Sequence, residues 1–157
     1  MNDLRNNTTR TGSSAVPLLW VALGVCAVTT VLALIDPWTT GLLAGQVASG
    51  YPHYGSAQIG AAVSAYVVIL ATVGVIGLIG WFVTIRLARR GRGAARWMDA
   101  VVSAFILVIA LIGLTTPDTS GMIGLAPVFG WLLLIPGLFG AIALVRMRRR
   151  TPTFGSA

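Results

Sequence analysis

Four long apolar stretches constrain the fold of this chain more than any other feature of its sequence. They cover residues 17–35, 59–85, 98–116 and 122–145. A helix of about 20 apolar residues crosses the hydrocarbon core of a bilayer, and the backbone polar groups of such a segment must be satisfied within the protein. The sequence therefore predicts an all-α membrane protein built as a four-transmembrane-helix bundle.

The composition supports this interpretation. Of the 157 residues, 56% are hydrophobic and 10% are charged, which is too little polar surface for a water-soluble globule of this size. The second stretch is longer than the hydrocarbon core requires and should tilt or project beyond it. The third stretch is the weakest of the four. It qualifies only if Asp99 lies at the headgroups and Thr115 and Thr116 lie near the opposite surface.

The basic residues predict the orientation of the chain. All eleven are arginines, located before the first stretch, between the second and third, and after the fourth: Arg5, Arg10, Arg86, Arg89, Arg90, Arg92, Arg96, Arg146, Arg148, Arg149 and Arg150. Arginine near the end of a span is retained on the cytoplasmic side. Both termini are therefore expected in the cytoplasm.

The same arginines are expected to lie against anionic lipid headgroups. The predicted headgroup contacts are Arg86, Arg89, Arg90, Arg92, Arg96, Arg148, Arg149 and Arg150. The net charge of +7 would suggest nucleic acid in a soluble domain, but here the expected partner is the bilayer and no nucleic acid is expected.

The domain organisation follows from these features. Residues 1–15 are predicted to form a disordered cytoplasmic tail and residues 16–147 a single membrane domain. Within that domain, residues 36–56 form an outer loop and residues 86–96 a basic cytoplasmic connector. Residues 148–157 form a basic tail.

The outer loop holds the candidate binding residues. Residues 41–49 are apolar enough for a short helix on or in the outer membrane surface. Tyr51, His53 and Tyr54 follow, and Asp36 begins the loop. One interpretation is a lip that binds a ligand or docks a partner, in which His53 changes charge below about pH 6.5. The alternative is that amphipathic rings settle at the membrane interface.

Glycines recur at helical spacing in two of the stretches. They are Gly74, Gly77 and Gly80 in the second stretch, and Gly130, Gly137 and Gly140 in the fourth. Small residues at this spacing let membrane helices approach closely. We expect them to pack helices, within the chain or in a homo-oligomer or larger membrane complex.

Tryptophan, which favours the bilayer interface, lies mostly near the predicted span ends. These residues are Trp20, Trp38, Trp81, Trp97 and Trp131.

The sequence also contains a possible internal repeat. An offset of eighty residues superposes the first stretch on the third and the segment from Leu34 on the one from Leu114, which would fit a parallel duplication of a two-helix hairpin. The recurrence of turn-forming residues explains the same match.

Several kinds of chemistry are disfavoured by the residues that the chain lacks. It has no Glu and no Lys, one cysteine, Cys26, and one histidine, His53, so multi-histidine or multi-cysteine metal sites cannot form within one chain. We expect no cofactor and no catalytic centre. No ionisable residue is expected inside a span, since Asp99 should lie at the inner end with Arg96 one turn away as its partner.

The whole chain loosely resembles small four-span membrane proteins, of no known function, from high-GC actinobacteria. The resemblance is carried by the Arg-only basic set, by residues 80–90, and by the ending Val145-Arg146-Met147-Arg148-Arg149-Arg150. It implies a bacterial plasma membrane. We expect a non-enzymatic accessory or assembly subunit or small homo-oligomer. The alternative is a small transporter or channel lined by hydroxyl groups and glycine backbone, and an outer-surface enzyme using His53 with Asp36 is the least favoured.

Overall fold

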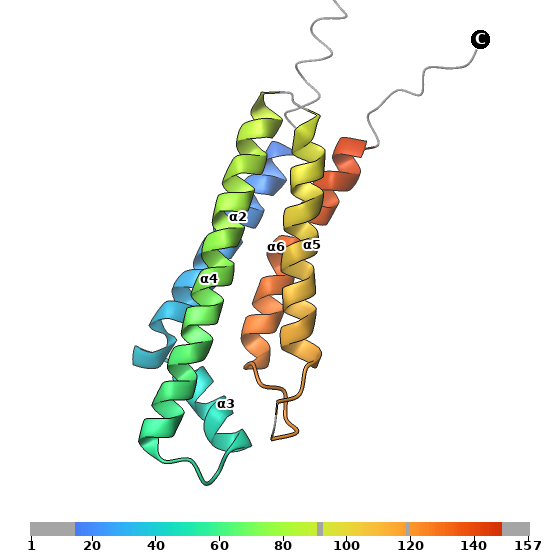
Figure 1. The fold of residues 1–157 in the computed structure, drawn as a ribbon. Helices are drawn as coiled ribbons and strands as arrows, with labels where there is room; N and C mark the ends of the chain where they lie inside the picture. Colours follow the sequence, from blue (N-terminus) through green and yellow to red (C-terminus); the bar gives the residue numbers. More distant parts are fainter. Residues whose placement is uncertain (1–14, 91–92, 119, 149–157) are drawn as a thin grey trace, which may run out of the picture.

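The computed structural model describes residues 15–90, 93–118 and 120–148. Over these residues the chain is helical, with one isolated bridge between Pro117 and Ile123. The elements are α2 (Val16–Ile35), the 3-10 turn η1 (Asp36–Trp38), α3 (Leu42–Gly50), α4 (Ser56–Arg89), α5 (Ala94–Thr115) and α6 (Pro127–Arg148) (Figure 1). The helices α2, α4, α5 and α6 are long and apolar enough to cross a membrane. The predicted all-α fold with four membrane-spanning helices is confirmed, and the chain is a multi-pass membrane protein.

The helix bounds differ most from the predicted spans at both ends of α4 and at the starts of α5 and α6. Helix α4 has 34 residues, about 51 Å at 1.5 Å per residue, and therefore tilts or projects beyond a hydrocarbon core of about 30 Å. Helix α5 begins at Ala94, four residues before the predicted span. Helix α6 begins at Pro127, whose missing N–H suits a first helical position, so residues 122–126 belong to the preceding turn.

These bounds shorten the basic connector. Arg86 and Arg89 lie in the last turn of α4, and Arg96 lies in the first turn of α5. Only residues 90–93 join the two helices. Arg86, Arg89 and Arg96, which were predicted to lie in a loop, are therefore part of helix ends.

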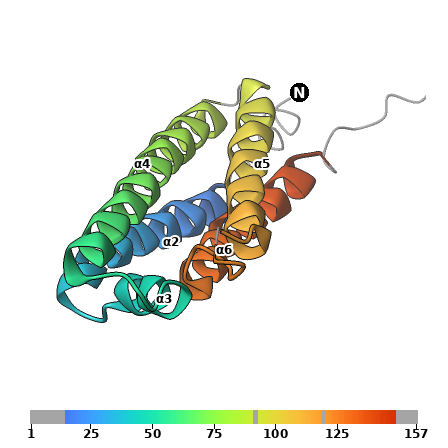
Figure 2. The same cartoon turned by 60° about the horizontal axis from the view of Figure 1, so that its bottom comes forward.

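The helices form two hairpins that pack side by side. Helix α2 packs on α4 and α6, and α5 packs on α6 and, less extensively, on α4 (Figures 1 and 2). The start of α2, the end of α4, the start of α5 and the end of α6 meet at one end of the bundle (Figure 1). We call this the basic end, because it carries Arg86, Arg89, Arg96, Arg146 and Arg148.

The opposite end is covered by α3, at what we call the α3 end (Figure 2). The short helix predicted over residues 41–49 is present as α3, and it packs on the bundle. Leu43 and Val47 are buried in a core cluster with Leu70 of α4 and Phe129 of α6. The Gln46 Nε2 group also donates to the Ile123 carbonyl at 2.7 Å, which ties α3 to the turn between α5 and α6.

A second core cluster fills the half of the bundle nearer the basic end. It contains Trp81, Leu19, Cys26, Ile106 and Ala143, which come from all four long helices. Trp81 is 0% exposed, so its prediction as an interfacial anchor is wrong. The other four tryptophans are exposed to different degrees, and Trp20 lies under the Arg89 guanidinium at 5.7 Å.

The glycines of α4 and α6 lie where helices come closest inside the bundle. A Cβ atom at Gly77 would approach Cys26 Sγ to 3.0 Å and Ile106 Cδ1 to 3.4 Å, and one at Gly80 would approach Val102 Cγ2 to 2.6 Å. The remaining glycines of the two strings face other side chains in the same way: Gly74 faces Thr30, Gly130 faces Leu114, Gly137 faces Leu107, and Gly140 faces Trp81 and Ser103. These glycines therefore leave room for close helix packing within the chain.

Replacing Gly140 by alanine tests this packing. The added Cβ would overlap the Trp81 ring and the Ser103 hydroxyl, and overpacking of this kind costs about 1–3 kcal/mol. Gly24→Ala is the matched control, because nothing lies within 4 Å of a Cβ there and alanine favours a helix by up to about 1 kcal/mol. We expect thermal unfolding in detergent to show a lower midpoint for Gly140→Ala and an equal or higher one for Gly24→Ala. Equal midpoints for the two variants would contradict the packing role.

Candidate functional site

The most unusual residue of the interior is Asp99. Because α5 begins at Ala94, Asp99 lies in the second turn of that helix and is 0% exposed. Its Oδ1 atom accepts a long hydrogen bond of 3.5 Å from the Ser103 hydroxyl, and its Oδ2 atom has no hydrogen-bond partner among the described residues. Asp99 is therefore buried among the helices rather than exposed at the inner end of its span, and its depth in the membrane stays a prediction.

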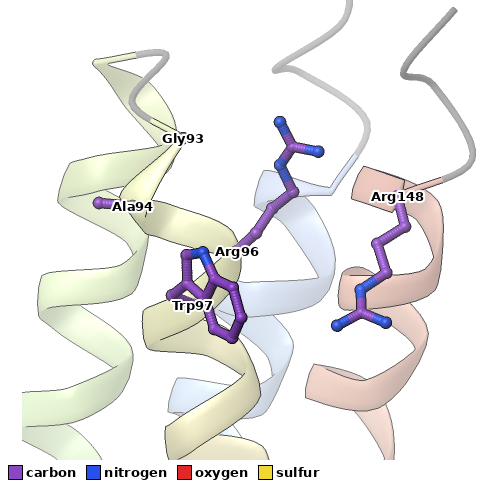
Figure 3. A pocket seen from close by; sticks show the side chains of 5 residues that line it. All are labelled: Gly93, Ala94, Arg96, Trp97 and Arg148. Atoms are coloured by element: carbon purple, nitrogen blue, oxygen red, sulfur yellow. The ribbon is translucent and has the colours of Figure 1, made fainter. Parts of the chain in front are cut away.

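Arg96 does not act as the expected partner of Asp99. No ion pair joins Asp99 and Arg96 in the described part of the chain, and the Arg96 side chain extends toward the end of the bundle (Figure 3). The neighbours of Ser103 are Gly140 and, across that glycine, the Trp81 ring. The Trp81 Nε1 atom is itself buried without a hydrogen-bond partner. We call Asp99, Ser103 and Trp81 the interior polar cluster.

Most other buried hydroxyl groups are engaged by their own helices. Thr30 Oγ1 donates to the Cys26 carbonyl and Thr84 Oγ1 to the Gly80 carbonyl, both at 2.8 Å. Such bonds explain a hydroxyl in a membrane helix without any ligand. Thr29 Oγ1 is the exception, since it is buried without a hydrogen-bond partner.

The interior polar cluster can hold a proton on the Asp99 carboxyl, but it does not resemble a metal centre. Within residues 15–90, 93–118 and 120–148, no three His, Cys, Asp or Glu side chains lie close enough to bind a metal ion. An ionisable residue inside a membrane span is costly and usually functional. Asp99 is therefore the first residue to test for activity.

Replacing Asp99 tests whether its carboxyl group stabilises the fold. A buried carboxyl with an unsatisfied oxygen costs about 1–3 kcal/mol, so Asp99→Leu, which keeps the branched shape of the side chain without its polar oxygens, should raise the unfolding midpoint in detergent. Ser103→Ala removes the hydrogen bond that this carboxyl accepts and should lower the midpoint. A clear fall for Asp99→Leu would show that the carboxyl has a stabilising partner.

At the α3 end, Asp36 serves as a cap for α3. It is 1% exposed, and its carboxylate oxygens accept hydrogen bonds from the Leu42 and Leu43 backbone N–H groups, each at 3.0 Å. The Thr40 hydroxyl donates to the same carboxylate. A carboxylate at a helix N-terminus is stabilising, and Gly41, at φ +61°, allows the chain to turn into the helix.

The other predicted lip residues are placed apart from Asp36. Tyr51 and Tyr54 stack with ring centroids 4.5 Å apart, and His53 is exposed in the turn between them. No described contact joins His53 to Asp36. The structure therefore does not bring these four residues together into one site.

Sequence reasoning did not identify Asp118, which lies in the turn between α5 and α6. Its carboxylate accepts hydrogen bonds from the Ser120 hydroxyl at 2.5 Å and the Ser120 N–H at 2.8 Å. These bonds, with a smaller contribution from the Tyr51 hydroxyl, hold the pKa of Asp118 below its usual value. Asp118 therefore links the turn to the end of α3.

The Asp118 bonds predict a pH dependence of this turn. Because its folded-state pKa is lowered, the carboxylate stabilises the turn above its unfolded pKa of about 4 and loses that effect as the pH falls through the folded-state pKa. Ser120→Ala should raise the pKa of Asp118 and so move the loss to higher pH, measured by NMR titration of the Asp118 carboxyl carbon. Ser49→Ala, which removes a hydroxyl bonded to the Gln46 carbonyl instead, should leave it unchanged. An unaltered titration in Ser120→Ala would contradict this assignment.

Two of the predicted headgroup arginines, Arg96 and Arg148, line an open pocket at the basic end. The pocket has a volume of about 610 Å³ and is lined by Gly93, Ala94, Arg96 and Trp97 of α5 and its start, and by Arg148 of α6 (Figure 3). Arg86, Arg89 and Arg90 are exposed near the end of α4. The predicted contacts of Arg92, Arg149 and Arg150 lie outside the described residues.

A second hollow, also missed by sequence reasoning, lies between α4 and α5 within the spans. It has a volume of about 370 Å³. Its lining is entirely apolar: Ile76, Gly77, Ile79 and Gly80 of α4, and Met98, Val101, Val102 and Phe105 of α5. We call it the α4–α5 groove.

No protein-family model, curated protein or solved structure matches this chain.

Proposed function

We propose that this protein is a non-enzymatic integral protein of a bacterial plasma membrane that acts through helix packing, as a small homo-oligomer. The observation that carries the proposal is the α4–α5 groove, an apolar hollow between two spans. Between membrane helices the driving force is close packing rather than exclusion of water. A partner helix that fills this hollow would therefore make packing contacts that α4 and α5 do not make with each other.

The shape of the groove suits a helix from a second copy. Gly77 and Gly80 contribute no side chains to it, while Ile79 and Val101, which also line it, are 60% and 63% exposed. The chain presents exposed branched apolar side chains on α6, such as Leu138, Ile142 and Val145, which a second copy could insert into the groove. The alternative is a larger membrane complex, in which a helix of a different protein occupies the groove.

Filling the groove tests this proposal. Val101→Phe adds volume at an exposed groove residue, and Val28→Phe adds it at a residue of matched exposure, 58%, on α2. If a second copy seats its helix in the groove, Val101→Phe should weaken self-association by about tenfold, the equivalent of about 1.4 kcal/mol, while Val28→Phe should have a smaller effect. The measurement is subunit counting by single-molecule photobleaching in lipid. A monomeric wild type, or equal effects of the two substitutions, would contradict self-association through the groove.

For the orientation, we propose that the basic end faces the cytoplasm, so that both termini are cytoplasmic. The supporting feature is that every described arginine lies at the basic end and none at the α3 end. Reporter fusions after Arg90 and after Arg148 should give a cytoplasmic signal, and fusions at Gly50 an external one. An external signal after Arg90 would reverse the assignment.

A parallel duplication remains part of this proposal. The α2–α4 and α5–α6 hairpins both start and end at the basic end (Figure 1), as two copies of one hairpin would. The first hairpin would then have gained η1 and α3 between its helices.

A transporter or channel is the second candidate, and Asp99 is the observation that favours it. A buried carboxyl with an oxygen that has no hydrogen-bond partner among the described residues is the type of group that binds a transported proton or ion. The hydroxyl groups of Thr30 and Thr84 count against a hydroxyl-lined pathway, because they donate to their own helices. Ion flux in proteoliposomes that Asp99→Asn abolishes, with stability retained, would favour transport over the packing function.

A further inference from the structure

We propose that Asp99 is a proton-binding site whose carboxyl group is neutral in the folded protein at about pH 7. The observation that carries the proposal is a carboxyl group that is 0% exposed and has one oxygen, Oδ2, without a hydrogen-bond partner among the described residues. The packing function proposed above requires no carboxyl group, so this inference goes beyond it and is tested separately.

A second buried carboxyl group in the same chain shows what an ionised side chain needs. Asp36 is 1% exposed, and its oxygens accept hydrogen bonds from the Leu42 and Leu43 backbone N–H groups, each at 3.0 Å. The Thr40 hydroxyl donates to the same group. Hydrogen bonds from such donors stabilise the charged form of a carboxyl group. Asp36 therefore has, in spite of its burial, the contacts that a carboxylate requires.

Asp99 lacks comparable contacts. The only hydrogen bond that the structure describes for its side chain is the long one from the Ser103 hydroxyl, at 3.5 Å. An ionised carboxylate that is buried without donors or a cation is costly, and such a group takes up a proton instead. The two aspartates are equally buried, so the difference between them lies in the donors that surround them.

No buried cation compensates for the missing donors. Apart from Asp99, the buried charged residue of the described chain is Asp36, at the α3 end. The core cluster in the Asp99 half of the bundle contains one titratable group, the Cys26 thiol of α2, and a thiol is neutral at about pH 7. Arg96 is partly buried and extends toward the end of the bundle (Figure 3). The arginines of α4 and α6 at that end are exposed: Arg86, Arg89, Arg146 and Arg148.

The proton on Asp99 is linked to the packing of α5. Ser103, which bonds to Asp99, lies where Gly140 lets α6 approach α5, because a Cβ atom at Gly140 would overlap the Ser103 hydroxyl. Loss of the proton while the helices stay packed would leave an unpaired charge beside this contact. Release of the proton therefore requires the helices to separate there.

Infrared spectroscopy detects this proton directly. The C=O stretching band of a protonated carboxyl group is separate from the bands of a carboxylate, and the chain has only four acidic side chains, all aspartates. Full-length protein with carbon-13 in its aspartate carboxyl groups is measured at about pH 7 in a maltoside detergent, which has no carbonyl group. Asp118→Asn is the matched control, since hydrogen bonds from Ser120 hold the pKa of Asp118 below its usual value.

We expect an isotope-shifted band with the intensity of one aspartate in four. The band should be missing from Asp99→Asn and present in Asp118→Asn. Its absence from the labelled wild type would overturn the proposal, and that measurement needs no variant to fold. Its persistence in Asp99→Asn would place the proton on another aspartate and would also overturn the proposal.

The dependence of stability on pH provides a second measurement. An aspartate in the unfolded chain is ionised above about pH 4, so unfolding between about pH 5 and 7 releases the proton that Asp99 holds in the fold. The folded state then binds more protons than the unfolded state, and its stability falls as the pH rises. Asp99→Asn removes this contribution and keeps those of all other groups.

We therefore expect the unfolding midpoint of the wild type in detergent to fall relative to that of Asp99→Asn between about pH 5 and 7. Asp118→Asn should follow the wild type in parallel, because Asp118 is ionised in both states over this range. Parallel midpoints of the wild type and Asp99→Asn would mean that Asp99 has the same charge in the folded and unfolded protein, and would overturn the proposal.

Discussion

The contact that α6 makes at Gly140 with α5 and with the Trp81 side chain of α4 is the contact on which the rest of the bundle depends. There the Trp81 ring and the Ser103 hydroxyl occupy the space that any larger residue at position 140 would need. In a bilayer, lipid tails are as apolar as the helix surfaces, so helices associate only where their shapes fit closely. The glycines of α4 and α6 provide that fit, and Trp81 fills the volume between the helices.

The same contact explains why a buried carboxyl can exist in this protein. Asp99 lies one turn from Ser103 and is covered by protein rather than lipid. A lipid-facing carboxyl at that depth would be costly, whereas inside the bundle it can retain one hydrogen bond. Because its second oxygen has no partner, the residue is poorly explained by stability alone. Proteins commonly accept such a cost where function requires it.

The sequence predicted the number and approximate position of the spans because hydropathy and the distribution of arginines depend on chain position alone. It did not predict which way each helix faces. Trp81 and Asp99 were assigned to the membrane surface because they lie near predicted span ends, but both are buried in the bundle.

The Asp36 cap was also not predictable from the sequence. Its carboxylate accepts from the N–H groups of Leu42 and Leu43, six and seven residues further along the chain. A usual side-chain cap bonds to an N–H group two or three residues ahead. These features, and the two pockets, depend on how helices rotate and pack, which local patterns do not encode.

Helix α5 contributes to both features to which we assign function, the α4–α5 groove and Asp99. The described lining of the basic-end pocket includes Gly93, Ala94, Arg96 and Trp97, and the α5 side of the α4–α5 groove consists of Met98, Val101, Val102 and Phe105. Asp99 lies between them on the buried face of the same turns. Helix α5 packs more extensively on α6 than on α4. The α4–α5 groove lies along the less extensive of these two contacts. The α3 end, by contrast, is held by Gln46, Asp36 and a buried core. The arrangement therefore concentrates the open surfaces along α5 and toward the basic end, while the opposite end is closed by the protein itself.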